Sequence, residues 1–162
     1  FPERPNGHHS EEEYAEELER LLHESVRLRL RSDVPFGAFL SGGVDSSTIV
    51  ALMSQIMQEP VKTFSVGFRR AGNGTDELPY ARQVADLFQT DHHEIVIGPG
   101  DFIDMAEKVI WHMDQPIADQ ATVATYMLSH LAAQKVKMVL TGEGGDEFGI
   151  GERAPHFLRR IG

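Results

Sequence analysis

The feature that most constrains the fold is a short apolar run that ends abruptly in a glycine turn. Residues 36–40 read Phe-Gly-Ala-Phe-Leu, and Ser41-Gly42-Gly43-Val44-Asp45-Ser46-Ser47 follows directly. The apolar run is typical of a buried strand, and residues 45–57 have the apolar spacing of a helix. Two adjacent glycines let the backbone turn sharply between these elements and approach a ligand closely. The sequence therefore predicts a strand–turn–helix unit with accessible backbone at the turn.

Other strands and helices alternate along the rest of the chain. A Ser10–Glu13 capping box opens a predicted helix over 11–31, which Pro35 and the residues before it end. The other predicted strands are 61–68, 91–97 and 136–140, and the other predicted helices are 76–88, 121–134 and one capped by Asp101 that runs to about Met113. This alternation predicts an α/β fold with a mostly parallel sheet. Because runs 36–40 and 136–140 are apolar throughout, we expect helices on both faces and three α-β-α layers.

Length and composition narrow the class of protein. The 162 residues fit one domain, and 41% hydrophobic with 25% charged residues is ordinary for a soluble chain. No apolar run approaches the roughly 20 residues that span a bilayer, and the N-terminus lacks signal-peptide features, so we expect a cytoplasmic protein without a membrane partner. The net charge of −10 argues against general nucleic-acid binding. The absence of cysteine excludes disulfides, zinc–thiolate sites and a thiol nucleophile within this chain.

The first glycine turn has the electrostatics of a phosphate site. The first N–H groups of the following helix have no helical acceptor and carry the positive end of the helix dipole. Ser41, Ser46 and Ser47 add hydroxyl donors, whereas the Asp45 carboxylate would repel phosphate unless Mg²⁺ bridged the two. The turn lacks the glycine and lysine pattern of a P-loop and the Gly-x-Gly-x-x-Gly pattern of dinucleotide sites. The simpler alternative is a serine-rich helix cap that binds nothing.

A second acidic glycine turn follows the apolar run 136–140. It reads Thr141-Gly142-Glu143-Gly144-Gly145-Asp146-Glu147. Ligands of open parallel sheets bind outside the carboxyl ends of the strands, so both turns should face one crevice. That placement makes Asp45 and Asp146 candidate Mg²⁺ ligands. The alternative is an ordinary acidic surface turn.

These turns and their flanking segments together resemble the synthetase domain of the glutamine-hydrolysing asparagine synthetase family. The matching segments follow the family's order over about residues 12–148 and are 32–35, 39–47, 64–68, Asp91-His92-His93-Glu94, 114–119 and 139–147. After Glu147 the family continues Leu-Phe-Gly-Gly-Tyr, whereas this chain continues Phe-Gly-Ile-Gly-Glu-Arg. We therefore expect a flexible segment over 1–10, the synthetase-like domain over 11–148 and an irregular tail over 149–162.

The resemblance implies an adenine-nucleotide α-hydrolase-like (Rossmann-like) fold and a ligase of asparagine biosynthesis. In this family the side-chain carboxylate of aspartate attacks the α-phosphorus of ATP, and pyrophosphate leaves. Ammonia then displaces AMP from β-aspartyl-AMP to give asparagine. The implied cofactors are ATP and Mg²⁺.

The resemblance also assigns roles to individual residues. The implied ATP-binding residues are Leu40, Ser41, Gly42, Gly43, Asp45, Ser46, Ser47, Val66, Thr141 and Gly142. Among them the loop 41–47 would hold the pyrophosphate portion, and the other four would contact adenosine. Glu143 and Asp45 would be catalytic, and Asp45 and Asp146 would bind Mg²⁺. Asp119 lies in a segment that the family uses near the amino-acid substrate.

Members of the family also carry parts that this chain lacks, namely a glutaminase (glutamine amidotransferase) domain that releases ammonia and a C-terminal helical region. We therefore expect a piece of a longer protein that by itself binds ATP weakly and does not turn over. The oligomeric state stays open, a homodimer included. Two other functions remain open: a related adenylating amide or lactam synthetase with another carboxylate substrate, and a non-catalytic nucleotide-binding or scaffold domain.

Overall fold

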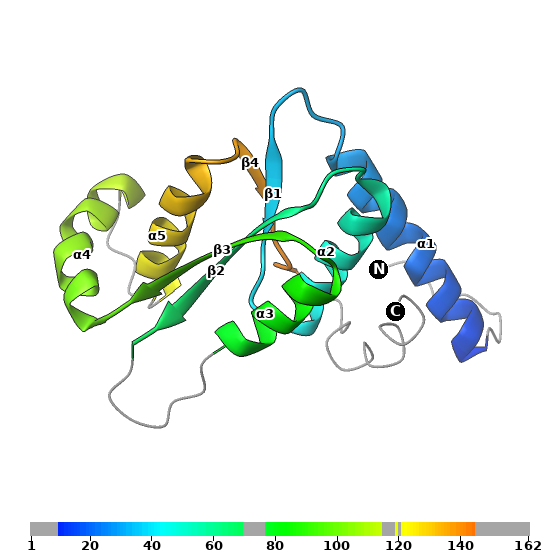
Figure 1. The fold of residues 1–162 in the computed structure, drawn as a ribbon, viewed down its shortest axis with the longest axis horizontal. Coiled ribbons are helices and arrows are strands. Elements are labelled where there is room, and N and C mark those ends of the chain that lie inside the picture. Colours follow the sequence, from blue (N-terminus) through cyan, green and yellow to red (C-terminus); the bar gives the residue numbers. More distant parts are fainter. Residues whose placement is uncertain (1–9, 70–76, 115–118, 120, 145–162) are drawn as a thin grey trace.

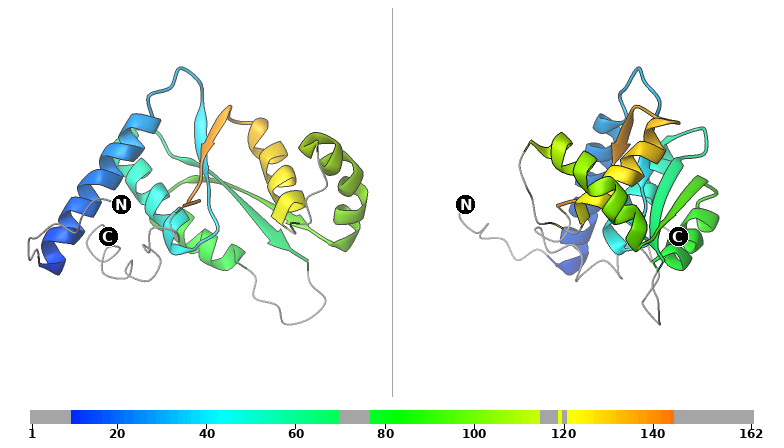
Figure 2. Two further views of the ribbon diagram at one scale, coloured as in Figure 1. Left: turned by 180° about the vertical axis from the view of Figure 1, so that it is seen from behind. Right: turned by 90° about the vertical axis from the view of Figure 1, so that its left-hand side faces the viewer.

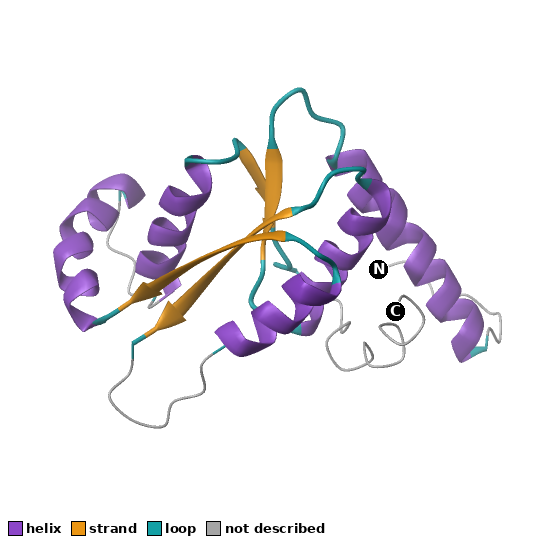
Figure 3. Cartoon of the chain, in the orientation of Figure 1, coloured by secondary structure: helices purple, strands orange, loops and turns teal. Residues whose placement is uncertain are grey.

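Four parallel strands and five helices make up the part of the chain that the computed structural model describes, which is residues 10–69, 77–114, 119 and 121–144. In chain order the elements are α1 (Glu11–Arg29), β1 (Phe36–Phe39), α2 (Val44–Ile56), β2 (Lys62–Phe68), α3 (Leu78–Leu87), β3 (Asp91–Ile97), α4 (Pro99–Met113), α5 (Ala121–Ala133) and β4 (Met138–Leu140) (Figure 1). The strands form one sheet in the order β3-β2-β1-β4, and every neighbouring pair is parallel. Figure 3 shows the strands at the centre of the molecule with helices on either side.

Helices cover both faces of this sheet. On one face α1, α2 and α3 bury an apolar cluster against β1 whose members include Val26, Ala38, Val50, Leu52, Met53, Ala81 and Ala85. On the other face α5 packs on β2 and β3, and α4 packs on α5 (Figure 2). The fully buried Phe64 of β2 meets Leu128 and Ala132 of α5 there. The predicted three-layer α/β fold with a parallel sheet is therefore confirmed.

Most observed bounds differ from the predicted ones by one or two residues, and at two elements the structure shows the cause. Helix α4 begins at Pro99 with Gly98 as its N-cap, because proline suits the first helical position. Asp101 is not the cap but lies one turn inside, where its carboxylate accepts a hydrogen bond of 2.6 Å from the Gly98 N–H. The last strand begins at Met138 rather than Val136, because the Val136 N–H donates to Ala132 O and closes the end of α5.

The strand order creates a switch point beside β1. The chain adds β2 and β3 on one side of β1, then returns through α4 and α5 to place β4 on the other side. Open α/β sheets bind ligands outside the carboxyl ends of the strands at such a reversal. Both glycine turns begin there, since Ser41 follows β1 after Leu40 and Thr141 follows β4 directly. In the described residues, no helix combines the length and apolar character that crossing a bilayer requires.

A polar network lies near the amino ends of β2 and β3. The Thr63 hydroxyl is 2.8 Å from both Thr90 Oγ1 and His92 Nδ1, and His92 Nε2 is 3.2 Å from Glu94 Oε1. Arg82 of α3 donates two hydrogen bonds of 2.7 and 2.6 Å to the Glu94 carboxylate. Arg82 lowers the pKa of Glu94, and burial lowers the pKa of His92 despite the opposing pull of Glu94. The network joins α3 to the sheet through Glu94.

The lowered pKa of His92 predicts a loss of stability in mild acid. Above the usual histidine pKa of 6.5 the imidazole is neutral in both states. As the pH falls below 6.5, the unfolded chain takes up a proton before the native state does, so the free energy of unfolding decreases. We expect His92→Gln to flatten this decrease between pH 7.5 and 5.5 in urea titrations. An unchanged pH slope in the variant would contradict this account.

Candidate functional site

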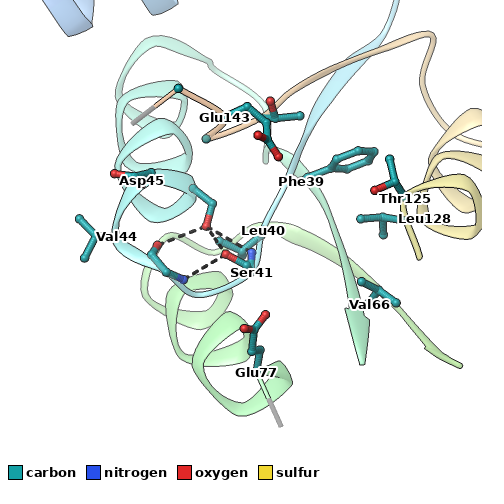
Figure 4. A pocket seen from close by; sticks show the side chains of 15 residues that line it. Phe39, Leu40, Ser41, Val44, Asp45, Val66, Glu77, Thr125, Leu128 and Glu143 are labelled. Carbon is teal, nitrogen blue, oxygen red and sulfur yellow. Dashed lines mark hydrogen bonds between the residues drawn. The ribbon is translucent and has the colours of Figure 1, made fainter. Parts of the chain in front are cut away.

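A cavity of about 720 Å³ opens at the carboxyl ends of the strands beside the switch point (Figure 4). Its volume falls in the range of pockets that bind small molecules, roughly 300–1,000 Å³. The lining residues come from β1 and the first turn, α2, β2, α3, α5 and the second turn. They are Phe39, Leu40, Ser41, Gly43, Val44, Asp45, Ser46, Val66, Glu77, Thr125, Leu128, Thr141, Gly142, Glu143 and Gly144.

Serine hydroxyls hold the first turn in shape. Ser46 Oγ accepts a hydrogen bond from the Ser41 N–H and donates one to Gly43 O, both 3.2 Å. Ser41 Oγ accepts from the Gly43 N–H at 3.2 Å, and Ser47 Oγ donates to Gly43 O at 2.7 Å. The Ser65 hydroxyl of β2 donates to Leu40 O and fixes the end of the strand run. The turn is thus rigid before any ligand arrives, and the N–H groups of the first turn of α2 remain for one.

Gly42 allows the first turn to pack closely against α3. Its φ of +81° lies in the left-handed region that favours glycine. A Cβ at this position would lie 2.6 Å from both Ala81 N and Tyr80 Cβ. Gly42 therefore serves packing between the turn and α3, and it is not among the residues that line the cavity.

Gly142 brings the second turn against the beginning of α2. A Cβ on Gly142 would lie 2.7 Å from Ser46 N and 3.0 Å from Asp45 Cβ. No side chain fits between these backbones, so only glycine allows the approach. The contact joins two segments almost a hundred residues apart in sequence, and both turns line one crevice.

The two ends of the cavity differ in chemistry. Near α2 and the second turn it offers helix N–H groups, hydroxyls and the carboxylates of Asp45 and Glu143. Toward α5 its walls are Phe39, Val66 and Leu128, which also pack around the apolar cluster of that face. Such a surface suits a ligand with a charged end and a flat apolar end.

Not all predicted residues meet at the cavity. The buried Ser47 is directed to its own helix by its bond to Gly43 O, and it does not line the cavity. Asp119 is exposed, and its Oδ1 accepts a hydrogen bond of 2.9 Å from Ala121 N at the start of α5. Asp146 lies outside the described residues. The remaining predicted residues, Leu40, Ser41, Gly43, Asp45, Ser46, Val66, Thr141, Gly142 and Glu143, line the cavity.

The sequence reasoning missed four notable lining residues: Phe39, Glu77, Thr125 and Leu128. Phe39 ends β1 and Leu40 follows it, so their side chains lie on opposite faces of the sheet. The sequence does not tell that both residues line the cavity. Thr125 and Leu128 are three residues apart on α5 and so share a face, but nothing in the sequence tells which face meets the cavity. Glu77 precedes α3 and carries no sequence signal.

Comparison with known proteins settles the family. The family model described as asparagine synthase matches residues 17–161 of this chain. The chain belongs to the asparagine synthase family. The match extends beyond residue 148, where the resemblance of the individual motifs ends. The strand–turn–helix unit and the second glycine turn are therefore features of a family member.

Two relatives illustrate the extent of the similarity. A putative glutamine-hydrolysing asparagine synthetase 2 of Methanocaldococcus jannaschii is 40% identical over 161 aligned residues, which cover 91% of this chain and 31% of the relative. The glutamine-hydrolysing asparagine synthetase 1 of Bacillus subtilis is 37% identical over 137 residues, which cover 85% of this chain and 21% of that protein. The chain thus spans less than a third of the length of either relative.

A solved structure supports the fold. The NMN synthetase of Francisella tularensis superposes with a TM-score of 0.53 at 20% identity, and the alignment covers 89% of this chain and 59% of that one. At this identity the similarity concerns the fold alone. The similarity supports the α/β fold with a parallel sheet that the motifs implied.

Proposed function

We propose that this chain is the ATP-binding part of a carbon–nitrogen ligase that activates the side-chain carboxylate of aspartate as β-aspartyl-AMP. Family membership supports the amide-forming chemistry. The observation that carries the proposal is the approach of Gly142 to the first turn of α2, which joins both glycine motifs in one cavity. Ammonia would then convert the adenylate to asparagine.

The cavity suggests how ATP would lie. The triphosphate would bind over the first turn, where the N–H groups of α2 and its dipole favour negative charge. The adenosine would extend along Leu40 and Val66, with Thr141 and Gly142 beside it. The buried Ser46 and Ser47 would keep the anion site in shape from behind.

Mg²⁺ would be held by Asp45 together with the phosphates. Mg²⁺ usually binds one or two protein carboxylates and completes its shell with phosphate oxygens and water. Among the described residues no three His, Asp or Glu side chains are grouped closely enough to hold a metal ion alone. A site shared with the nucleotide fits that observation, with Asp146 as a proposed second ligand. When bound, the ion would neutralise charge that develops on the leaving pyrophosphate.

The chain's own residues would position the substrates and stabilise charge, and they would form no covalent bond with them. An oxygen of the aspartate carboxylate attacks the α-phosphorus, and the bond from that phosphorus to the pyrophosphate oxygen breaks. Oriented N–H groups at the turn stabilise the charge that builds on the phosphoryl oxygens. Glu143, which lines the cavity from the second turn, would act in forming the adenylate. Ammonia would attack the acyl carbon, and AMP would leave.

Other parts of the proposal concern the whole protein. A glutaminase domain would supply ammonia from glutamine, and residue Asp119 would lie near the amino-acid substrate.

The division into 1–10, 11–148 and 149–162 stays a prediction, because most of the two outer segments lies outside the described residues. The expected location in the cytoplasm likewise stays a prediction.

The decisive experiment is aspartate-dependent exchange of labelled pyrophosphate into ATP by the complete gene product. Exchange is expected only when aspartate is present, because labelled pyrophosphate enters ATP when β-aspartyl-AMP forms and then reacts in reverse. Formation of ADP instead of AMP would contradict the mechanism. Exchange with a different carboxylate would favour a related amide or lactam synthetase, and binding of MgATP without any exchange would favour a non-catalytic domain.

A further inference from the structure

Thr125 lines the cavity from helix α5, outside both glycine turns. It lies in the second turn of α5, three residues before Leu128, so both side chains emerge from one face of the helix. Both line the cavity, and Figure 4 shows them side by side across from Phe39. The beginning of α5 thus reaches the carboxyl edge of the sheet, where the proposed nucleotide binds.

Thr125 itself is exposed, and its neighbours in the cavity are apolar. Phe39, Val66 and Leu128 form the neighbouring wall and belong to the packing on the α5 face of the sheet. Within the described part of the chain, the Thr125 hydroxyl makes no hydrogen bond. A threonine inside a helix can bond to the carbonyl one turn back, but this one does not. Its hydroxyl is therefore available at the edge of an apolar surface.

The position of the anion site decides which part of a nucleotide would come here. With the triphosphate over the first turn of α2, the charged end of the ligand is fixed at the other end of the cavity. The apolar wall of Phe39, Val66 and Leu128 then receives the flat end, which is the nucleobase. A purine edge carries both acceptor nitrogens and, in adenine, an amino donor, and a hydroxyl can serve either.

We propose that the Thr125 hydroxyl hydrogen-bonds the edge of the nucleobase and determines how tightly the base is held. This inference rests on the proposed function, because it requires ATP in the cavity. Thr125 is then a specificity residue that lies on α5, outside both glycine motifs. Its contribution concerns the base and leaves the phosphates untouched.

The test compares two ligands on the complete gene product by calorimetry. The first is MgATP, and the second is the Mg²⁺ complex of a methyl riboside 5′-triphosphate, which keeps sugar and phosphates but has no base. Thr125→Val removes the hydroxyl at nearly constant volume. We expect it to weaken MgATP binding about three- to tenfold, as the loss of one hydrogen bond implies, and to leave the ligand without a base unaffected. Thr125→Ser keeps the hydroxyl and should restore most of the affinity.

The matched control is Thr122→Val, one turn earlier on α5, where the half-buried side chain does not line the cavity. It should leave both affinities unchanged. Equal weakening of both ligands by Thr125→Val, or no weakening of either, would overturn the role of Thr125 and leave the proposed function standing. Absence of MgATP binding by the complete wild-type gene product would overturn both.

Discussion

Asp45→Ala in the complete gene product is expected to lower aspartate-dependent pyrophosphate exchange by about 10² to 10³-fold. A group that stabilises charge developing in the transition state is typically worth this much. Asp45 lines the cavity and belongs to the first turn of α2, where the anion site is proposed. Without it, Mg²⁺ would lose a protein ligand beside the phosphates, and the remaining carboxylates would be left to repel ATP.

Stability separates this role from a purely structural one. As an acidic residue in the first turn, Asp45 also interacts favourably with the helix dipole, which is worth about 0.3–1 kcal/mol. Urea unfolding of Asp45→Ala measures the loss of stability and shows whether the variant is folded under the assay conditions. Asp86→Ala, at an exposed position on α3 outside the cavity, is the matched control and should keep full exchange. Near-normal exchange by Asp45→Ala would exclude a role in metal binding.

Gly142→Ala is expected to separate the two turns and to weaken MgATP binding by about tenfold or more. The added Cβ would lie 2.7 Å from Ser46 N, so a backbone segment must move. Forcing an atom into a closed contact of this kind typically costs about 1–3 kcal/mol of stability unless the two segments move apart. A loss of about 1.4 kcal/mol in binding free energy corresponds to a tenfold loss of affinity. The movement would widen the crevice where the phosphates and the adenosine are proposed to bind.

Gly100→Ala provides the control for this substitution. Gly100 lies in the first turn of α4, and a Cβ there would meet no atom within 4 Å. Alanine is the better helix former, so the free energy of unfolding should stay the same or rise slightly. Nucleotide titrations of both variants, with circular dichroism to check the fold, measure the difference. If Gly142→Ala bound MgATP as tightly as Gly100→Ala, the approach of the two turns would not matter for binding.

Much of the fold could be predicted because its signals are local. The apolar run before Ser41, the Ser10–Glu13 capping box and the alternation of strands with helices each depend on neighbours in sequence. The capping box is present, with the Glu13 N–H donating to Ser10 Oγ at 3.2 Å. The ends of elements are harder to predict. Val136 is apolar and fits a strand, but its N–H donates to Ala132 O at the end of α5.

Side-chain roles at the cavity were harder to predict, because they depend on direction. The serine-rich loop predicts a line of hydroxyl donors toward phosphate, yet Ser46 and Ser47 are turned toward the carbonyl of Gly43. The same residue types are compatible with both arrangements. Which one forms depends on the packing of α2 against the sheet and on the close approach of Gly142.

The loop 41–47 by itself determined a strand–turn–helix unit with an anion-binding turn, because glycine conformation, helix N–H groups and apolar periodicity are all properties of adjacent residues. Only the tertiary structure decided what surrounds that turn. The strand order places β4 beside β1 and so brings Gly142 to within contact of Ser46, and α5 brings Thr125 and Leu128 to the same cavity. Separation in sequence does not predict these contacts, because they depend on where the connecting helices place each strand in the sheet.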